Sequence, residues 1–419
     1  MSHTFVDVQG LAGAFSLGAV QEGFDMVARR SLPGGFGDDS VEVNRQLLGN
    51  TNWEQQTGQW ETWEPVEAAF ACGTPPCSGF SLLNTSKGQN ARGADAAIND
   101  CMKALVSYAG RCKGSDGLQG PQIVSFESVQ GAFSQGRDLM KVLRTMMEED
   151  TGNQYTLTHV KMSGSAVGSA QMRHRYYFVI HRIPFGINTP EEKRVVTYGD
   201  AIGDLVGAPE FTWGSQEYPT VNEPTDWALD KRDSPTLNSH IHPTTGKFVD
   251  LVNELEPYWF AGEDINKAVK RLGYKPDAVR ANRYNEDGTV RGWTWPRRID
   301  PEKPGYVITG GGVLSFVHWA EPRFLTIREI SRLMGYPDSW AWNFVSTPMR
   351  ASMLIGKCSP VQSNRFIAKA VHDALDGDPQ TGDSNTISIG DREYLHNSTN
   401  VYKPWLKNQL AAREDVLYA

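Results

Sequence analysis

Cysteine is scarce in this chain of 419 residues, and long apolar runs are absent. The five cysteines are odd in number and lack the paired CxxC spacing of a zinc site. We therefore expect reduced thiols and no metal ion. No apolar stretch reaches the roughly 18 residues that a membrane-spanning helix needs, and the polar start MSHTFVDVQG lacks the basic and apolar regions of a signal peptide. These absences predict a protein of the cytoplasm with no membrane partner.

An excess of basic residues is also missing, because the net charge is −8 at pH 7. That balance argues against general adhesion to nucleic acid. Between residues 265 and 303, however, basic side chains outnumber acidic ones and aromatic side chains are interleaved with them. In this basic aromatic segment the basic residues are Lys267, Lys270, Arg271, Lys275, Arg280, Arg283, Arg291, Arg297, Arg298 and Lys303, and the aromatic ones are Tyr274, Tyr284, Trp293 and Trp295. The mixture suits phosphate contact with base stacking, although a solvated face above core tryptophans gives the same pattern.

The first part of the chain alternates between strand and helix patterns. It opens with a strand ending near Asp7, a turn rich in Gly and Ala, a helix over about 16–23 and a strand over 24–28, which together form a βαβ unit. Further strands are predicted at 67–73, at 121–129 and up to Ile183, and helices at 98–112 and 135–149. After a long region rich in Pro, Trp, Asn and Gly, helices return within 325–337 and 360–375. This order predicts an α/β fold with a parallel sheet.

Reactive side chains follow the predicted strands. In GTPPCSGFS two prolines stiffen the loop that presents Cys77, and Glu127 ends the next strand. Carboxyl ends of parallel strands share one edge, so both side chains are expected in one crevice, with Arg173 and Arg175 alternating nearby. A thiolate nucleophile, a proton-donating carboxyl group and guanidinium groups suit conjugate addition to a polar heterocycle. Taken singly, each residue could instead be a packed thiol, a solvated or salt-bridged acid, or a solvated edge.

Five segments together resemble the DNA cytosine-C5 methyltransferases, in the order usual for that family. GTPPCSGFS is similar to the Pro-Cys nucleophile loop, FESVQGAF to the Glu-Asn-Val segment, and SAQMRHRYYFVI to the Gln-x-Arg-x-Arg strand. RFLTIREISRLMGYPDSW is similar to the Arg-x-Leu-Thr-x-Arg-Glu helix, and LIGKCSPVQSNRFIAKAV to the closing Gly-Asn segment. The resemblance implies a class I methyltransferase Rossmann-like sheet with a smaller, irregular target-recognition domain.

The same resemblance implies a mechanism. The target cytosine is flipped out of double-stranded DNA, Cys77 adds to C6, and Glu127 binds N3 and the amine and protonates the ring. Arg175 holds O2 and Arg173 supports the loop, so that C5 attacks the methyl group of S-adenosylmethionine. We expect a monomer in the cytoplasm of a bacterial or phage-infected cell.

The resemblance also divides the chain. Residues 1–182 and 339–376 would form the catalytic domain, 183–338 the target-recognition domain with the basic aromatic segment, and 377–419 a C-terminal extension. The residues implied in DNA contact are Ser81, Arg92, Arg283, Arg291, Arg297 and Arg298.

Departures from the family pattern gather on the cofactor side. The first turn reads DVQGLAGAF, with Leu11 and Ala14 at two glycine positions, and the ribose-binding acid expected near Ser31 is missing. Asp38, Asp39 or Glu42 could replace that acid if the loop folds back. The closing Gly-Asn has become Gly356-Lys357. The residues implied in cofactor binding are Asp7, Ala12, Gly13, Phe15, Ser16, Pro76 and Lys357.

These departures keep other functions open. Cytosine activated by Cys77 could attack a methylene-tetrahydrofolate, as in thymidylate-synthase-like enzymes, to give hydroxymethylcytosine, or it could attack a carboxylated sulfonium. Lys357 would suit either donor by pairing with its extra carboxylate. A catalytically silent DNA-binding protein on a methyltransferase scaffold is a further alternative, opposed by the retained Cys77, Glu127 and Arg175. An RNA cytosine methyltransferase is disfavoured by the long variable region.

Overall fold

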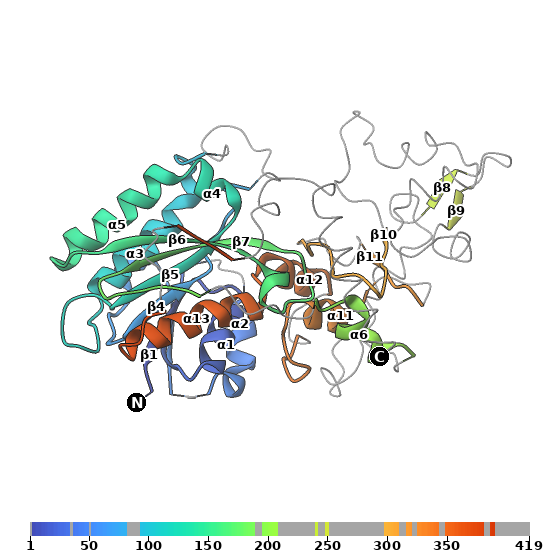
Figure 1. Ribbon diagram of the computed structural model, residues 1–419, viewed down its shortest axis with the longest axis horizontal. Coiled ribbons are helices and arrows are strands. Elements are labelled where there is room, and N and C mark those ends of the chain that lie inside the picture. The colour runs from blue at the N-terminus through green and yellow to red at the C-terminus, as the bar shows by residue number, and fades with distance from the viewer. Residues whose placement is uncertain are drawn as a thin grey trace. The chain divides into compact units, whose positions relative to one another are not determined.

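The computed structural model describes residues 2–33, 37–49, 52–81, 93–188, 195–207, 239–241, 248–250, 297–309, 316–320, 325–342, 348–380 and 386–389 (Figure 1). The chain divides into two compact units. The first comprises Met1–Val195 with Cys358–Ala419, and the second comprises Val196–Lys357. The second unit takes in residues 339–357, which the sequence assigned to the closing part of the catalytic domain.

The first unit is built on one eight-stranded sheet with the order β12-β6-β7-β5-β4-β1-β2-β3. Its strands are β1 (Thr4–Val8), β2 (Asp25–Ser31), β3 (Glu54–Thr57), β4 (Phe70–Gly73), β5 (Ile123–Ser128), β6 (Thr156–Ser163), β7 (His174–His181) and β12 (Thr386–Ile389). All pair in parallel except β7, which runs antiparallel to both β5 and β6. The predicted α/β fold is confirmed, with one reversed strand in a sheet expected to be parallel.

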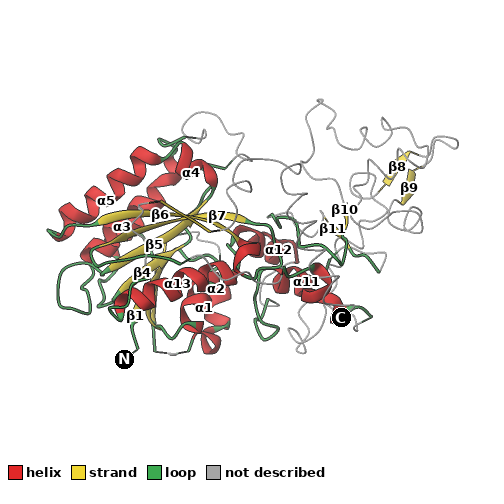
Figure 2. Cartoon of the chain, in the orientation of Figure 1, coloured by secondary structure: helices red, strands yellow, loops and turns green. Residues whose placement is uncertain are grey.

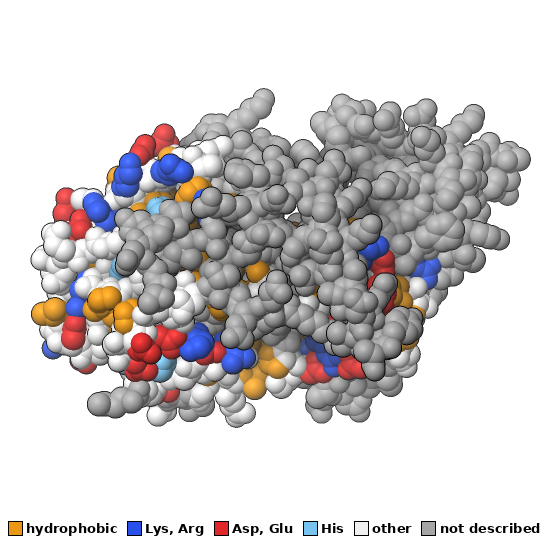
Figure 3. All heavy atoms as spheres, viewed as in Figure 1, with side chains coloured by type: hydrophobic (Ala, Val, Ile, Leu, Met, Phe, Trp, Pro, Cys, Tyr) orange, Lys and Arg blue, Asp and Glu red, His pale blue; other side chains and the backbone are white. Residues whose placement is uncertain are grey.

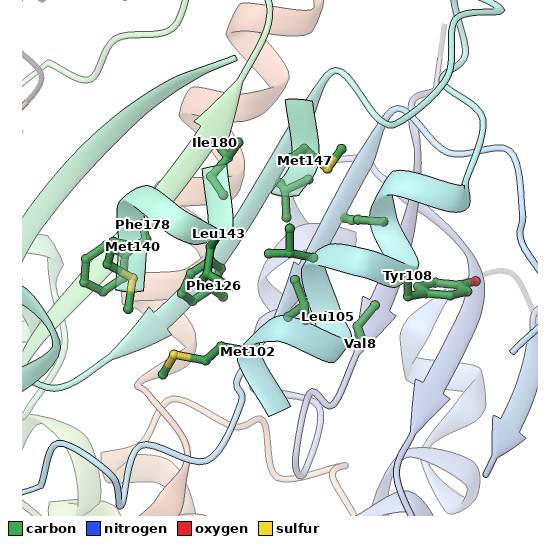
Figure 4. Packing of buried hydrophobic residues seen from close by; sticks show 14 of the residues in the cluster. Val8, Met102, Leu105, Tyr108, Phe126, Met140, Leu143, Met147, Phe178 and Ile180 are labelled. Carbon is green, nitrogen blue, oxygen red and sulfur yellow. The ribbon is translucent and has the colours of Figure 1, made fainter. Parts of the chain in front are cut away.

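Helices cover both faces of this sheet (Figure 2). The helices of the first unit are α1 (Ala14–Gln21), α2 (Asp38–Val43), α3 (Asp100–Arg111), α4 (Gln130–Ser134), α5 (Arg137–Thr151) and α13 (Val361–Leu375), and short 3₁₀ turns lie at Arg45–Leu48, Trp60–Thr62, Ala97–Asn99 and Gly164–Val167. Side chains alternate along β7, so Phe178 and Ile180 join the core beneath α3 and α5 (Figure 4), whereas Tyr177 points to the opposite face. The first unit therefore has one apolar layer on each side of its sheet.

Helices α1 and α13 pack so closely that Gly18 has no room for a side chain. A Cβ atom built on Gly18 would lie 2.6 Å from the backbone nitrogen of Arg365. The contact joins the start of the chain to its closing helix, which also carries Asn364, and this explains how segments far apart in sequence form one unit.

Replacing Gly18 with Ala is expected to lower the free energy of unfolding by about 1–3 kcal/mol, because the new methyl group forces the backbones of α1 and α13 apart. Urea unfolding followed by circular dichroism measures the change. Gly203→Ala is the matched control, since a Cβ atom there has nothing within 4 Å. An equal loss of stability in both variants would contradict the packing argument.

In the second unit, the Thr-x-Arg-Glu motif of the sequence lies at the start of a helix, where its side chains make structural contacts. Its elements are α6 (Tyr198–Ile202), a 3₁₀ turn at Gly203–Leu205, β8 (Ser239–Ile241), β9 (Phe248–Asp250), β10 (Arg297–Arg298), β11 (Phe316–Val317), α11 (Ile327–Leu333) and α12 (Pro348–Lys357). The hydroxyl of Thr326 and the carboxylate of Glu329 form a capping box that starts α11. The buried guanidinium of Arg328 donates to the carbonyls of Pro337 and Trp340, both at 3.3 Å. The Thr-x-Arg-Glu segment thus starts α11 and holds the segment that follows this helix.

Over the described residues, no helix is long and apolar enough to cross a membrane. On the face drawn in Figure 3, the described acidic and basic side chains of the first unit lie interspersed, without a separate field of one sign.

Candidate active site

The loop that carries Cys77 is held at both ends. Before it, Gly73 brings β4 close to β1, since a Cβ atom there would lie 2.1 Å from the carbonyl oxygen of Val8. After it, the backbone N–H of Phe80 donates to the carbonyl of Cys77 at 3.0 Å, and the Phe80 ring is fully buried in the core. The turn leaves Cys77 half-buried at the carboxyl end of β4. The two prolines and the anchored phenylalanine therefore present the thiol on a short, fixed loop.

The reversed direction of β7 brings Arg175 to the same edge. Glu127 is the fifth residue of β5, and its register partner on β7 is Tyr177. Arg175 lies two residues earlier on β7 and therefore projects from the same face. Its Nε atom lies 3.0 Å from Glu127 Oε2. Because β7 is antiparallel, its beginning, and not its end, meets the carboxyl ends of β4 and β5.

The four predicted catalytic residues form one electrostatic group. Burial raises the pKa of the Cys77 thiol, the negative charge of Glu127 raises it further, and Arg175 and Arg173 oppose this. Burial also raises the pKa of Glu127 against the same two arginines. Arg173 is buried, and its desolvation together with the charge of Arg175 lowers its pKa to about 9. The structure thus brings Cys77, Glu127, Arg173 and Arg175 together.

A facing pair of polar atoms at this site lacks hydrogen bonds. Oε2 of Glu127 and Nε of Arg175 are both buried, and their 3.0 Å contact does not have hydrogen-bond geometry. Leaving a buried donor or acceptor unsatisfied costs about 1–3 kcal/mol. An adjacent acceptor and donor in that state suit a flat ligand that offers a donor to one and an acceptor to the other.

A second layer of hydrogen bonds supports the site from behind. The hydroxyl of Tyr177 donates to Asn364 Oδ1 at 2.8 Å, and Ser359 Oγ donates to the same oxygen at 2.7 Å. Sequence reasoning missed Tyr177 and Asn364 as individual residues, although the segments that contain them carried the family resemblance. They connect β7, which carries Arg175, to α13.

The predicted cofactor residues around the first turn are mostly buried. Asp7 Oδ2 accepts a hydrogen bond from Ser16 Oγ at 2.5 Å, and both side chains are fully buried. Gly13 caps α1 with φ 79°, and Ala12 before it is buried. Phe15 is fully buried and packs against Phe70 and Tyr177, with ring centroids 6.0 Å away in each case. Cofactor contact through this ring, which the resemblance implied, is therefore not supported, because no face of Phe15 is exposed.

Arg29 is a residue of the cofactor side that sequence reasoning missed. Its side chain is 1% exposed and pairs with Asp7 at 2.5 Å and with Asp38 at 3.1 Å. An arginine inside a buried strand requires such partners, so the ARRS pattern of β2 was an available signal. Asp38 does fold back over β2, as the sequence required of an acid that replaces the missing one.

Comparison with known proteins identifies the family. Residues 4–373 match the family model described as C-5 cytosine-specific DNA methylase. This chain belongs to that family. It is 24% identical to the type II methyltransferase M.XorII of Xanthomonas oryzae over 93% of the chain and 89% of that protein, and 23% identical to M1.HphI of Haemophilus parahaemolyticus over 88% and 87%. The predicted family and enzyme class, a transferase acting on DNA cytosine, are confirmed.

A solved structure supports the fold. An E. coli prophage-encoded protein described as a DNA modification methyltransferase superposes with a TM-score of 0.58 at 17% identity, covering 90% of this chain and 100% of that one. The methyltransferase-type sheet expected from the sequence is thus confirmed for this C5 DNA methylase.

Most of the residues predicted to contact DNA either lie outside the described part of the chain or have a partner within the protein. Arg92, Arg283 and Arg291 lie outside the described residues, and so does the side chain of Arg297. Arg298 is buried, and its Nε and Nη2 atoms donate to the carbonyl of Trp319 at 3.1 and 2.5 Å. That contact gives Arg298 a structural role in the second unit and does not support a DNA contact.

Three residues predicted from the resemblance remain to be placed, namely Ser81, Pro76 and Lys357. Ser81 follows the Cys77 turn, and its backbone N–H donates to the carbonyl of Ser78 at 3.3 Å. Pro76 is half-buried directly before Cys77, and Lys357 is the half-buried last residue of α12 in the second unit.

One group of side chains bears on metal binding. Among the described residues, His3, His372 and Asp376 offer ligand atoms within 4.8 Å of one another. Asp376 lies 2.9 Å from His3 Nε2 and 3.1 Å from His372 Nδ1, which ties the start of the chain to the end of α13. The expectation of no metal stays a prediction.

Proposed function

We propose that this methylase transfers a methyl group from S-adenosylmethionine to C5 of a cytosine flipped out of double-stranded DNA. The observation that carries the proposal is the buried, unsatisfied pair of Glu127 Oε2 and Arg175 Nε beside the half-buried thiol of Cys77. A cytosine edge offers what this pair lacks, since its amine donates and its O2 accepts. Flipping costs a few kcal/mol of unstacking and is required, because C6 is out of reach inside a duplex.

In the proposed reaction, attack by the Cys77 thiolate forms an S–C6 bond. Glu127 accepts a hydrogen bond from the amine and donates its proton to N3, so the charge pushed into the ring is neutralised and electron density rises at C5. Arg175 donates to O2, and the positive charge of Arg173 favours the thiolate. After transfer to C5, a water acting as base removes the C5 proton, the S–C6 bond breaks and Cys77 leaves as a thiolate, and N3 returns its proton to Glu127.

The residues at the ends of β1 and β2 fit this cofactor in part. S-adenosylmethionine supplies an electrophilic methyl group when bound. The chain offers an acid at this edge, because Asp38 folds back over Ser31, and its turn at Ala12 and Gly13 brings backbone groups to the same edge. Pro76, next to Cys77, is proposed to contact the donor. Phe15 does not offer its ring.

A second candidate changes only the donor. The closing Gly-Asn of the family is Gly356-Lys357 in this chain, and an ammonium group there suits a donor with an extra carboxylate, either a methylene-folate or a carboxylated sulfonium. The chemistry of Cys77 and Glu127 would be unchanged, so the mass added to cytosine distinguishes the donors.

DNA recognition is proposed for residues 183–338, with the basic aromatic segment, apart from the buried Arg298, against the phosphates and Ser81 and Arg92 near the flipped base. The catalytic domain would then close with 339–376, followed by an extension over 377–419, and the enzyme would act as a monomer in the cytoplasm.

The deciding experiment is nucleoside mass spectrometry of cytosine-containing duplex DNA after incubation with the protein and S-adenosylmethionine. We expect cytosine heavier by one methyl group, absent with Cys77→Ala. A different Cys77-dependent mass, seen only with methylene-folate or with cell extract, would replace the donor. Tight DNA binding without any modified base would reject the enzyme activity in favour of a silent scaffold.

A further inference from the structure

Three side chains of types that bind metal ions converge at the amino end of β1. His3 directly precedes this strand, His372 lies in the last turn of α13, and Asp376 caps the end of that helix. One ligand atom from each residue lies within 4.8 Å of the other two. Because β1 and β4 are parallel, Cys77 lies beyond the opposite edge of the sheet, and a five-residue strand is about 16 Å long. The group is therefore separate from the cytosine site and from the predicted cofactor residues.

The carboxylate of Asp376 lies between the two imidazole rings. Its Oδ1 atom is 2.9 Å from His3 Nε2, and its Oδ2 atom is 3.1 Å from His372 Nδ1. The backbone N–H of Asp376 donates to the carbonyl of His372 at 3.0 Å, so the two side chains share one face of the helix end. Ligand atoms held tetrahedrally at about 2.0–2.1 Å from zinc lie about 3.3 Å apart. The separations of these side chains are thus close to those around a bound ion.

The surroundings of the group hold the rings and favour a cation. Phe24 packs against His3 and His372 with ring centroids 6.2 and 5.3 Å away, and the two imidazoles lie edge to face at 5.1 Å. The last carbonyl groups of α13 give the helix end a partial negative charge. The histidine side chains are 18% and 25% exposed and that of Asp376 is 49% exposed, so an ion and a water molecule can reach them.

We propose that His3, His372 and Asp376 bind a zinc ion that ties the amino end of β1 to the end of α13. Two imidazoles and a carboxylate suit zinc, with water as fourth ligand, whereas calcium and magnesium prefer six or more oxygen atoms. Each neutral imidazole presents its lone pair to the ion and carries its proton on the other ring nitrogen. The lack of paired cysteines argues only against a thiolate site and has no bearing on these ligands.

The ion would stabilise the folded chain. His3 and Asp376 are 373 residues apart in sequence, so the complete set of ligands exists only after folding. A ligand that binds only the folded state shifts the folding equilibrium towards it. Zinc should therefore strengthen the connection between the beginning of the first unit and its closing helix, and it should do so without any change at Cys77.

Calorimetric titration of the full chain tests the site, with protein that carries no polyhistidine tag and has been freed of metal by a chelator. The wild-type protein is expected to bind one zinc ion with a Kd of about 0.1–10 μM and to give no heat with magnesium. His3→Ala, His372→Ala and Asp376→Asn should each weaken zinc binding by at least about tenfold. Asp373→Asn is the matched control, because it removes a carboxylate of the same helix that pairs with Lys369, and it should bind zinc like wild type.

Thermal unfolding gives a second measurement that does not depend on heats of binding. Saturating zinc should raise the melting temperature of the wild type and of Asp373→Asn by about 3–8 °C, and it should leave that of His3→Ala unchanged. The melting curves without metal show at the same time that each variant is folded. Absence of zinc binding in the wild type, or equal binding in all three ligand variants, would overturn the site.

Discussion

Cys77→Ala is expected to abolish cytosine modification while leaving DNA binding within about twofold of wild type. The reaction begins with the S–C6 bond, and without a nucleophile C5 never gains the electron density for transfer, so the loss should be at least about 10³-fold. The half-buried thiol contributes little packing, and its loop is held by Gly73 and Phe80 rather than by sulfur. Rates come from transfer of labelled methyl groups, and affinities from fluorescence anisotropy.

A covalent trap makes this prediction stricter. DNA with fluorine in place of hydrogen at C5 of the target cytosine has no proton to lose after transfer, so the S–C6 bond should persist as a complex stable to denaturant. The complex should be absent with Cys77→Ala and present with Cys101→Ala, which removes another half-buried thiol. A stable complex in the Cys77 variant would contradict nucleophilic catalysis by Cys77.

Glu127→Gln is expected to lower the rate of transfer by about 10²- to 10⁴-fold, the range typical of a lost general acid. The amide keeps the size of the side chain and can still bind the cytosine edge, but it has no proton to give to N3. Substrate affinity should therefore change much less than the rate constant. Single-turnover kinetics separates the two quantities.

The pH dependence gives this prediction a sign. The pKa of Glu127 is raised by burial, and the Cys77 pKa is raised from its higher ordinary value. The active form needs a protonated Glu127 and a Cys77 thiolate. Between the two pKa values the thiolate fraction rises with pH as the protonated acid falls, so the wild-type rate should be flat there and should decline above the thiol pKa.

In Glu127→Gln only the thiol titrates, so the logarithm of the rate should climb with a slope of about one up to the thiol pKa and then level off. The exposed carboxylate variant Asp138→Asn should keep the wild-type profile. Parallel profiles in wild type and Glu127→Gln would show that another group donates the proton.

The sequence predicted well which residues the first unit brings together around Cys77, because their signals are local. The prolines before Cys77 and the acidic Glu127 after an apolar run mark the ends of β4 and β5. The parallel part of the sheet brings these two ends to one edge. The reversal of β7 and the existence of β6 were missed. Strand β6 reads TLTHVKMS, with polar residues at most positions, and its partner β7 is nearly continuous in apolar side chains, so neither pattern reveals the direction of pairing.

The cofactor half was harder to predict, since its determinants are contacts between distant residues. Phe15 was expected to bind the cofactor, but its ring packs against Phe70 of β4 and Tyr177 of β7. Neither Arg29 nor Arg30 was singled out from the sequence, yet both are buried and paired on opposite faces of β2. No local sequence pattern indicates that the Asp38 side chain packs back over the end of β2.

A turn held in place by a distant arginine couples two positions of the sequence. Leu11 has φ 49°, and its carbonyl accepts a hydrogen bond from Arg29 Nη2 at 2.7 Å. A glycine at position 11 would adopt the same conformation without such a restraint. The stability that Arg29 contributes to the turn therefore depends on which residue stands at position 11.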